Sequence, residues 1–186
     1  MGKNILCKTT ELSKTICEKF ADKEKTAIDA TCGSGRDTVW LAERFRKVYA
    51  FDIQQEAAEA TRRMTEACCV DNVTVICDGH QNMDKYVKEK AALVMFNLGY
   101  LPGGDKNVVT ETVTTLEGIE AALSLLEKDG LVCITMYPGH PQGAAERKAV
   151  LEMAAHLDKG KYHCVHANMV NQPDTAPEIL FITLKV

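Results

Sequence analysis

The chain contains no window that approaches the roughly 20 consecutive apolar residues of a membrane-spanning helix. Its first residues, 1–8, hold no long apolar stretch either, so no secretory signal is recognised in them. From these two absences we expect a cytoplasmic protein that makes no contact with a membrane.

The sequence also lacks metal-ligand spacing. Its eight cysteines include no Cys-x-x-Cys pair of the kind that a zinc site uses. Without a secretory signal their thiols are expected to be reduced, and no metal is predicted. The neighbours Cys68 and Cys69 fall on a predicted helix, where burial is the expected role.

The chain also has no excess of basic residues, since its formal net charge is −4. This balance argues against a general nucleic-acid-binding coat. It leaves contact with a nucleic acid open, since basic residues cluster locally and any cluster could meet phosphate. The clusters are Lys3, Lys8, Lys14 and Lys19; Arg44, Arg46 and Lys47; Lys85, Lys88 and Lys90; and Arg147 with Lys148.

What the sequence does have is a glycine turn between an apolar strand and a helix, at residues 25–38. Asp29 closes the apolar run, Gly33 and Gly35 let the backbone turn tightly, and Thr38 opens a helical apolar pattern. The first amides of such a helix point at whatever lies on the turn. This arrangement is typical of nucleotide-binding folds.

A second apolar run ends at Asp52, followed by Ile53. An acid at the end of the second strand of a βαβ unit is placed to accept hydrogen bonds from ribose hydroxyls. The third glycine that dinucleotide folds use is missing, and Asp37 at the helix start would repel a pyrophosphate. S-adenosylmethionine (SAM) has no phosphate and carries a cationic sulfonium, so Asp29 and Asp37 suit it better than they suit NAD.

The run from Asp29 to Gly35 resembles motif I of class I SAM-dependent methyltransferases, with Thr31 where the first glycine is common. More narrowly, this run, residues 96–105 and residues 137–140 resemble the YtqB/MnmM family. Its members, formerly described as rRNA methylases, are tRNA 5-(aminomethyl)-2-thiouridine methyltransferases. The similarity covers almost the whole chain.

The resemblance implies an α/β, Rossmann-like fold with a mostly parallel seven-stranded sheet and helices on both faces. Right-handed crossovers fit the alternation of strands and helices. Strands are expected at 26–30, 47–51, 73–77, 91–96 and 131–136, with an antiparallel C-terminal hairpin at 162–170 and 178–185. Helices are expected at 9–20, covering the sheet or the cofactor, and at 37–45, 54–69, 110–126 and 146–157, with Gly130 as a helix stop. Because 186 residues with 46% hydrophobic content support one sizeable core, residues 1–186 are expected to form a single domain.

The resemblance also implies further cofactor contacts. In methyltransferases of this class an acid after the third strand commonly meets the adenine amino group, which makes Asp78 the matching candidate. Gly79 follows it in what could equally be a plain turn, and His80 is expected to flank the adenine.

Substrate contacts are predicted at two loops that leave the same edge of the sheet. Asn97-Leu-Gly-Tyr100 looks like a variant of the Asn/Asp-Pro-Pro-Tyr motif of amine methyltransferases, without its prolines. We therefore hypothesise that Asn97 and the Leu98 carbonyl hold the target nitrogen next to the cofactor. Tyr100 packs on the wobble base, and His140 assists proton removal.

The implied reaction converts 5-aminomethyl-2-thiouridine at the tRNA wobble position to its methylaminomethyl form. The expected partner is the tRNA anticodon stem-loop, with a homodimer as one way for a small chain to span it. Asn171, in the turn of the final hairpin, is a further candidate for the site. Three alternatives stay open: a methyltransferase acting on rRNA or a small molecule, an NAD-dependent oxidoreductase, and a non-catalytic RNA-binding module.

Overall fold

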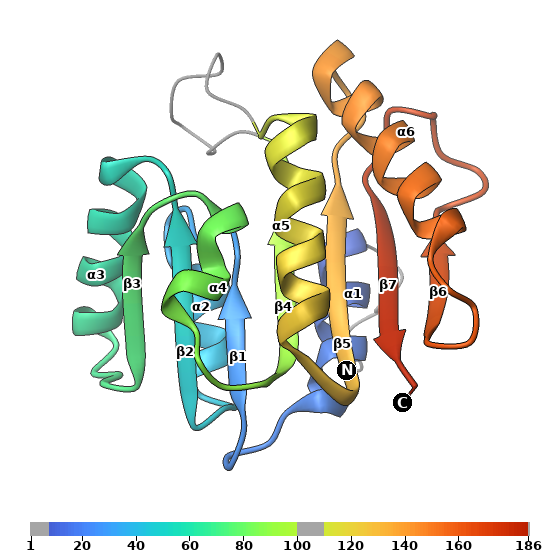
Figure 1. Ribbon diagram of the computed structural model, residues 1–186. Helices are drawn as coiled ribbons and strands as arrows, with labels where there is room; N and C mark the ends of the chain where they lie inside the picture. Colours follow the sequence, from blue (N-terminus) through green and yellow to red (C-terminus); the bar gives the residue numbers. More distant parts are fainter. Residues whose placement is uncertain (1–7, 100–109, 186) are drawn as a thin grey trace, which may run out of the picture.

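The computed structural model describes residues 8–99 and 110–185, which build a seven-stranded sheet with helices on both faces (Figure 1). The strands are β1 (Thr26–Asp29), β2 (Lys47–Asp52), β3 (Val73–Cys77), β4 (Ala91–Asn97), β5 (Leu126–Met136), β6 (Tyr162–Ala167) and β7 (Glu178–Leu184). The helices are α1 (Thr9–Cys17), α2 (Arg36–Ala42), α3 (Gln55–Ala67), α4 (Met83–Tyr86), α5 (Thr112–Leu125) and α6 (Pro141–His156), with 3-10 turns η1 (Glu18–Phe20) and η2 (His80–Asn82).

The strand order is β3-β2-β1-β4-β5-β7-β6. The pairs β1–β2, β1–β4, β2–β3 and β4–β5 are parallel, whereas β7 runs antiparallel to β5 and β6. This confirms the Rossmann-like α/β class and the antiparallel C-terminal hairpin. It also brings the ends of β1, β2 and β4 together at one edge, where open α/β sheets bind ligands.

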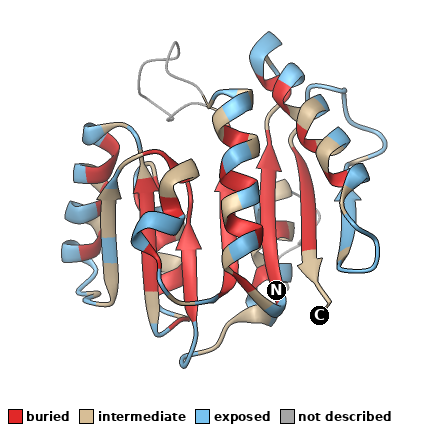
Figure 2. Ribbon diagram, in the orientation of Figure 1, coloured by how far each residue is buried: buried red, intermediate tan, exposed pale blue. Residues whose placement is uncertain are grey.

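The core lies in two layers, one on each face of the sheet. The central strands are buried along most of their length (Figure 2). The central strand β4 is buried on both faces, as its continuous apolar run predicts. Successive side chains serve opposite layers: Val94 and Phe96 pack with α4, α5 and α6, while Leu93 and Met95 pack with α1 and α2.

Several predicted boundaries are wrong. Helix α6 begins at Pro141 and not near residue 146, because His140 accepts a hydrogen bond from the Gly143 amide and proline is favourable in a first turn. Gly130 does not end α5. The helix stops at Leu125, the chain becomes extended at once, and the left-handed residue in this segment is Asp129, with φ of 60°.

Two short elements, η2 and α4, were not predicted, and the expected burial of the Cys68–Cys69 pair is wrong. Both thiols are exposed at the end of α3, where the chain turns with Cys69 at φ of 54°. Within residues 8–99 and 110–185 no helix is both long and apolar enough to cross a membrane. The same residues contain no group of three or more side chains that could hold a metal ion.

Candidate functional site

The loop between β1 and α2 forms the floor of the candidate site. Gly33 and Gly35 have φ of 51° and 84°, a left-handed conformation that glycine adopts without strain. The Cys32 amide donates to the Phe51 carbonyl at 2.8 Å, which ties the loop to β2. A Cβ on Gly35 would lie 2.9 Å from the Thr61 Cα, so the second glycine is also required by the close approach of α3.

Asp29, the acid that ends β1, is completely buried beneath this loop. It accepts hydrogen bonds from the Thr38 hydroxyl at 2.6 Å and from the Thr31 amide at 3.3 Å. Burial, followed by the nearby charge of Asp37, raises the pKa of Asp29 to about 7. The carboxyl therefore stabilises the turn from beneath. We predict that it influences a bound ligand through the conformation of the loop and through its negative charge.

Asp52 lies at the rim of the same loop. One carboxylate oxygen accepts from the Gly33 amide at 3.0 Å and the other from the Gln54 amide at 3.0 Å. Burial raises the pKa of Asp52, although the two amides oppose that rise. Next to it Ile53 is 70% exposed, an unusual state for a large apolar side chain. A carboxylate beside an exposed apolar surface suits a ribose attached to a flat base.

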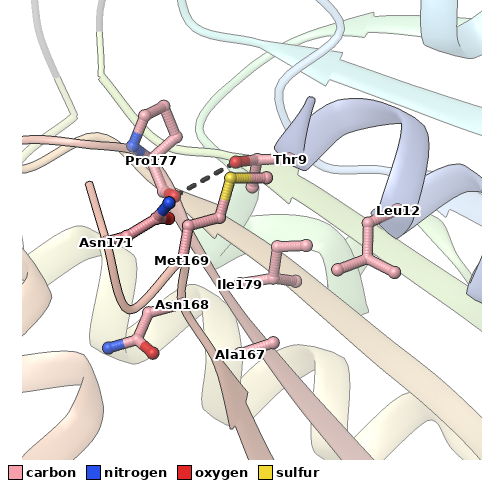
Figure 3. A pocket seen from close by; sticks show the side chains of 8 residues that line it. All are labelled: Thr9, Leu12, Ala167, Asn168, Met169, Asn171, Pro177 and Ile179. Carbon is pink, nitrogen blue, oxygen red and sulfur yellow. Dashed lines mark hydrogen bonds between the residues drawn. The ribbon is translucent and has the colours of Figure 1, made fainter. Parts of the chain in front are cut away.

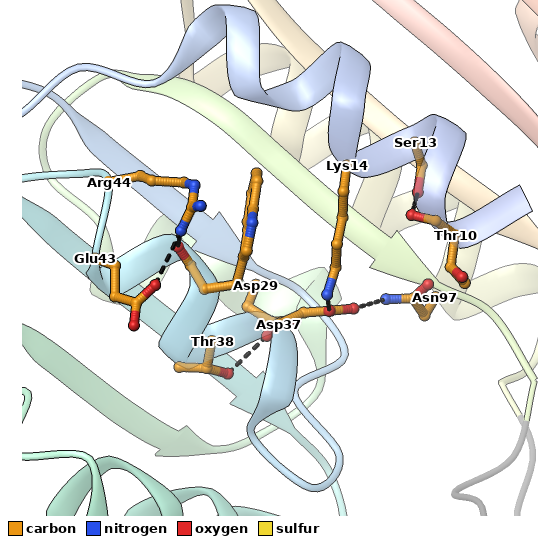
Figure 4. A network of polar contacts seen from close by, with 10 residues as sticks. Thr10, Ser13, Lys14, Asp29, Asp37, Thr38, Glu43, Arg44 and Asn97 are labelled. Atoms are coloured by element: carbon orange, nitrogen blue, oxygen red, sulfur yellow. Dashed lines mark hydrogen bonds and ion pairs between the residues drawn. The ribbon is translucent and has the colours of Figure 1, made fainter. Parts of the chain in front are cut away.

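Asp37, in the first turn of α2, joins this loop to the end of β4 (Figure 4). Its carboxylate contacts Lys14 Nζ of α1 at 2.5 Å and accepts from Asn97 Nδ2 at 2.9 Å. The Asn97 backbone amide donates to the Thr31 hydroxyl at 2.7 Å. Because a carboxylate accepts hydrogen bonds only, the amide nitrogen of Asn97 must face Asp37 and its Oδ1 remains the acceptor of that side chain.

Asp78 lies beyond β3 and is engaged locally. It accepts from the Tyr86 hydroxyl at 2.8 Å and from Asn82 Nδ2 at 2.9 Å. The hydrogen bond from Tyr86, and then that from Asn82, lowers the pKa of Asp78. Gly79 is buried next to it, where a Cβ would collide with the Gln81 side chain at 2.2 Å. Adenine contact by Asp78 stays a prediction.

His80 is buried, and its ring packs edge-on against Phe96 with the centroids 5.5 Å apart. Burial lowers the pKa of His80, against the opposing effect of backbone groups of Ala30 and Thr114. A Cβ on Gly118 of α5 would lie 2.3 Å from the His80 ring. This geometry gives the histidine a packing role, and its contact with adenine stays a prediction.

His140 caps α6, since its Nδ1 accepts from the Gly143 amide at 3.1 Å. For Nδ1 to take a proton, the ring would have to release that amide, so this geometry does not support His140 as a base. Its catalytic role stays a prediction. Tyr100 lies outside the described residues.

Sequence reasoning missed a buried carboxyl, Glu146 of α6. It accepts from the Thr110 hydroxyl at 2.8 Å and from the Thr115 hydroxyl at 2.6 Å, and burial raises its pKa. Thr110 in turn accepts from the Gly99 amide at 2.9 Å, so Glu146 anchors Gly99 through Thr110. Nothing in the sequence signals this burial, because glutamate is almost never fully buried unless it is paired, and the partners of Glu146 are distant in sequence.

The ion pair between Lys14 and Asp37 was also missed. Helix-surface lysines are usually solvated, and no local sequence pattern indicates that α1 contacts α2. Thr61 of α3 likewise carried no motif signal, although its hydroxyl donates to the Gly33 carbonyl at 3.1 Å. Both residues reach the loop from elements distant in sequence.

The residues at this edge fit SAM. The glycine turn gives close backbone approach, Asp52 offers a carboxylate to ribose hydroxyls and Ile53 offers an exposed apolar surface. The acids around the turn oppose a phosphate and suit a cation.

Comparison with known proteins agrees with this geometry. Residues 48–183 match a family profile described as "Putative rRNA methylase". The chain is 35% identical over 192 residues to the chloroplastic tRNA (mnm(5)s(2)U34)-methyltransferase of Arabidopsis thaliana, covering 94% of this chain and 69% of that protein.

Two solved structures share the whole fold. A protein of Clostridium thermocellum described as a "putative rRNA-methylase" is 35% identical with a TM-score of 0.93, covering 96% of this chain and 98% of that one. A protein of Streptococcus mutans described as a "putative methyltransferase", solved in complex with SAH, is 39% identical with a TM-score of 0.90, covering 96% of this chain and 99% of that one. With the glycine turn, these matches show that the chain belongs to the rRNA-methylase-like family of class I enzymes and is a SAM-dependent methyltransferase.

Proposed function

We propose that this enzyme methylates the aminomethyl nitrogen of 5-aminomethyl-2-thiouridine at the wobble position of tRNA. The coarser part, that the substrate is a tRNA, rests on the relative from Arabidopsis thaliana, whose name specifies the modified uridine at position 34. The more specific part of the proposal is that a primary amine is the nucleophile. It rests on the chemistry around Asn97.

The observation that carries the proposal is the hydrogen bond from Asn97 Nδ2 to Asp37 at 2.9 Å. It fixes the carboxamide with Oδ1 as acceptor, and the backbone bond to Thr31 fixes the main chain at the same residue. A carbonyl-type oxygen at the end of β4 is suited to accept an N–H of an amine. Such a contact aims the nitrogen lone pair, and positioning supplies much of the rate in a displacement reaction.

The charges around Asn97 favour the reactive form of that amine. An alkyl amine resembles lysine, with a pKa of about 10.4, and is nucleophilic only when it has lost its proton. An unpaired carboxylate beside it would stabilise the ammonium form. Here the ion pair with Lys14 offsets the charge of Asp37 at a distance of 2.5 Å. The substrate therefore meets a neutral amide backed by a neutralised carboxylate.

Bound SAM supplies the methyl group from its sulfonium. The chain supplies the binding site. The glycine turn and Asp52 hold the nucleoside end of SAM, and Asn97 positions the incoming nitrogen. Asp29, Thr31, Gly33, Gly35, Asp37, Thr38, Ile53, Asp78, Gly79 and His80 remain the predicted cofactor-binding set with them. Tyr100 and His140 remain predicted substrate contacts. We further propose a single-domain enzyme acting in the cytoplasm, with a homodimer as one way to span the stem-loop.

The test is methyl transfer to bulk tRNA from cells that lack this modification, followed by mass spectrometry of the nucleosides. The wild-type protein should convert the aminomethyl nucleoside to the methylaminomethyl form. Asn97→Ala should lower kcat by about 100-fold, the scale of lost positioning. Asn97→Asp keeps the shape and an acceptor but places a second carboxylate beside Asp37, so it should be as impaired as Asn97→Ala.

Near-wild-type turnover of either variant would remove the proposed role of Asn97, provided that both retain wild-type thermal melting. An unchanged nucleoside profile with the wild-type protein, together with methylation of rRNA or a small molecule in a substrate panel, would establish the alternative substrate class. Binding of SAM without turnover on any RNA would favour the non-catalytic module. Family membership already decides against the NAD-dependent oxidoreductase.

A further inference from the structure

A hollow of about 280 Å³ opens between the start of α1 and the loop that joins β6 to β7 (Figure 3). The Thr9 hydroxyl donates to the Pro177 carbonyl at 3.1 Å and closes one end. Leu12, Met169 and Pro177 supply apolar walls, while the carboxamides of Asn168 and Asn171 stand at the rim. The proposed methyl-transfer chemistry uses none of these residues.

The composition of the hollow suits a nucleobase. A base has flat apolar faces and a polar edge of alternating donors and acceptors. A carboxamide presents one donor and one acceptor side by side and pairs with such an edge in a bidentate way. Proteins recognise single-stranded RNA by splaying bases into pockets of this kind. The volume lies at the small end of ligand pockets, which suits one base and not a whole cofactor.

The walls of the hollow are held in shape by hydrogen bonds within the chain. Two hydrogen-bonded turns build the loop, Gln172 amide to Met169 carbonyl at 3.0 Å and Ala176 amide to Pro173 carbonyl at 2.8 Å. At the start of β7 the buried Glu178 is bound by Arg147 of α6, at 2.6 and 3.0 Å. Pre-formed walls lower the entropic cost of binding.

The hollow lies on the far side of Asn97 from the cofactor residues. Along the sheet edge the order is β2 and β1 with Asp52 and the glycine turn, then β4 with Asn97, then β5, and finally β7 and β6 with the hollow. Helix α1 links the hollow to Asn97, because Thr9 and Leu12 line the hollow and Lys14 pairs with Asp37, the partner of Asn97.

The register of the sheet gives the separation between Asn97 and the hollow. Asn97 of β4 is opposite Thr135 of β5, and Thr135 is opposite Ile179 of β7, which lines the hollow. Two strand spacings of about 4.8 Å place Asn97 and Ile179 about 10 Å apart. Stacked nucleotides are about 3.4 Å apart along one strand and lie farther apart when splayed. A base in the hollow and the target base at Asn97 can thus belong to neighbouring nucleotides that are splayed.

We infer that this hollow binds the base of the nucleotide next to the one that is methylated, with Asn168 and Asn171 reading its edge. The inference rests on the proposed function, since it takes the substrate to be a single-stranded RNA loop. It makes the hollow a determinant of which RNA is chosen, separate from the residues that hold the reacting nitrogen.

The experiment measures methyl transfer to synthetic anticodon stem-loops that carry the aminomethyl nucleoside. Asn168→Ala and Asn171→Ala should each lower kcat/KM for the stem-loop by five- to a hundredfold, the range for one lost bidentate contact with a base. Calorimetry should show unchanged SAM binding by both variants. Gln172→Ala is the matched control, an exposed carboxamide in the same loop that does not line the hollow.

Two further stem-loops, abasic on the 5′ or the 3′ side of the target, identify the base. With wild-type enzyme, kcat/KM for one of them should fall by at least the larger of the two single-variant factors, because the missing base removes the contacts of both carboxamides. On that RNA Asn171→Ala should lose nothing more, because enzyme and RNA then lack the same contact. The inference would be overturned if the losses from the variant and from the abasic RNA multiplied. It would also be overturned if the variants had the same kcat/KM as wild type on intact RNA.

Failure of the proposed function gives a different result, namely no transfer by the wild-type enzyme to any aminomethyl stem-loop. In that case fluorescence anisotropy measures the affinity of wild type and variants for the same RNAs. Equal affinity of the wild type, Asn168→Ala and Asn171→Ala for intact RNA would then overturn the inference as well.

Discussion

The buried carboxyl of Asp29 gives the sharpest stability prediction. The side chain has no exposed surface, and its pKa is raised from 3.8 to about 7, first by burial and then by the charge of Asp37. The folded protein therefore binds this proton more tightly than the unfolded chain does. The perturbation is Asp29→Asn, which removes the titration and keeps the size of the side chain.

The sign and size follow from linkage between proton binding and folding. The favourable contribution is complete below the unfolded pKa near 3.8 and is lost as the pH rises to the folded value of about 7. At about 1.4 kcal/mol per pH unit, this interval corresponds to a loss of about 4 kcal/mol from the free energy of unfolding. Above pH 7 both states are ionised, and the contribution no longer changes.

Urea unfolding at pH 5, 6, 7 and 8 measures this loss. The free energy of unfolding of wild type should fall relative to that of Asp29→Asn by about 3 kcal/mol between pH 5 and 8, since part of the titration lies below pH 5. Asp71→Asn, at an exposed acid, is the charge-matched control and should follow wild type. A difference between wild type and Asp29→Asn that does not vary with pH would refute the reasoning, whatever its absolute value.

Three other substitutions test separate parts of the site. Gly35→Ala should destabilise the protein by about 1–3 kcal/mol in urea unfolding, because φ is 84° and the new Cβ meets the backbone of α3 at 2.9 Å. Lys14→Met leaves the charge of Asp37 without its partner, so the substrate amine should hold its proton more tightly. The pH dependence of kcat should therefore shift to higher pH, and an unshifted pH dependence would contradict the proposed charge balance. Arg147→Met leaves the buried Glu178 without its bidentate partner and should lower the melting temperature, with a cost of about 2 kcal/mol, whereas Lys148→Met beside it should cost little.

The parts of the site that could be predicted are those encoded locally. The glycine turn and the position of Asp52 at the end of the second strand follow from strands, a turn and a helix that are continuous in sequence, whereas the exposure of Ile53 was not predicted. Strand β4 was predictable because burial on both faces demands an unbroken apolar run. The C-terminal hairpin followed from two β-prone stretches around a polar turn.

The parts that were missed depend on contacts between distant segments. No local pattern pairs Lys14 with Asp37 or buries Glu146 beneath two threonine hydroxyls. The start of α6 was missed because the Pro and Gly residues in 138–143 were interpreted as one loop, whereas the His140 cap makes residues 141–143 the first turn of a helix. Polar side chains that satisfy one another across the fold leave no periodic signal.

The same contacts change how the acids of the site act on a charged ligand. Lys14 offsets Asp37, and Asp29 is about half protonated near pH 7, so the turn is less negative than its sequence indicates. SAM carries a sulfonium charge that SAH lacks, and a cation near the turn favours the ionised form of Asp29. If that charge contributes about 1 kcal/mol, the ratio of SAM to SAH affinity should rise roughly three- to fourfold between pH 6 and 8, because Asp29 goes from about one tenth to about nine tenths ionised over this interval. Calorimetry at both pH values measures it, with Asp29→Asn expected to give a ratio that does not vary with pH. An equal rise in that variant would place the titrating group elsewhere and leave Asp29 with only its role inside the loop.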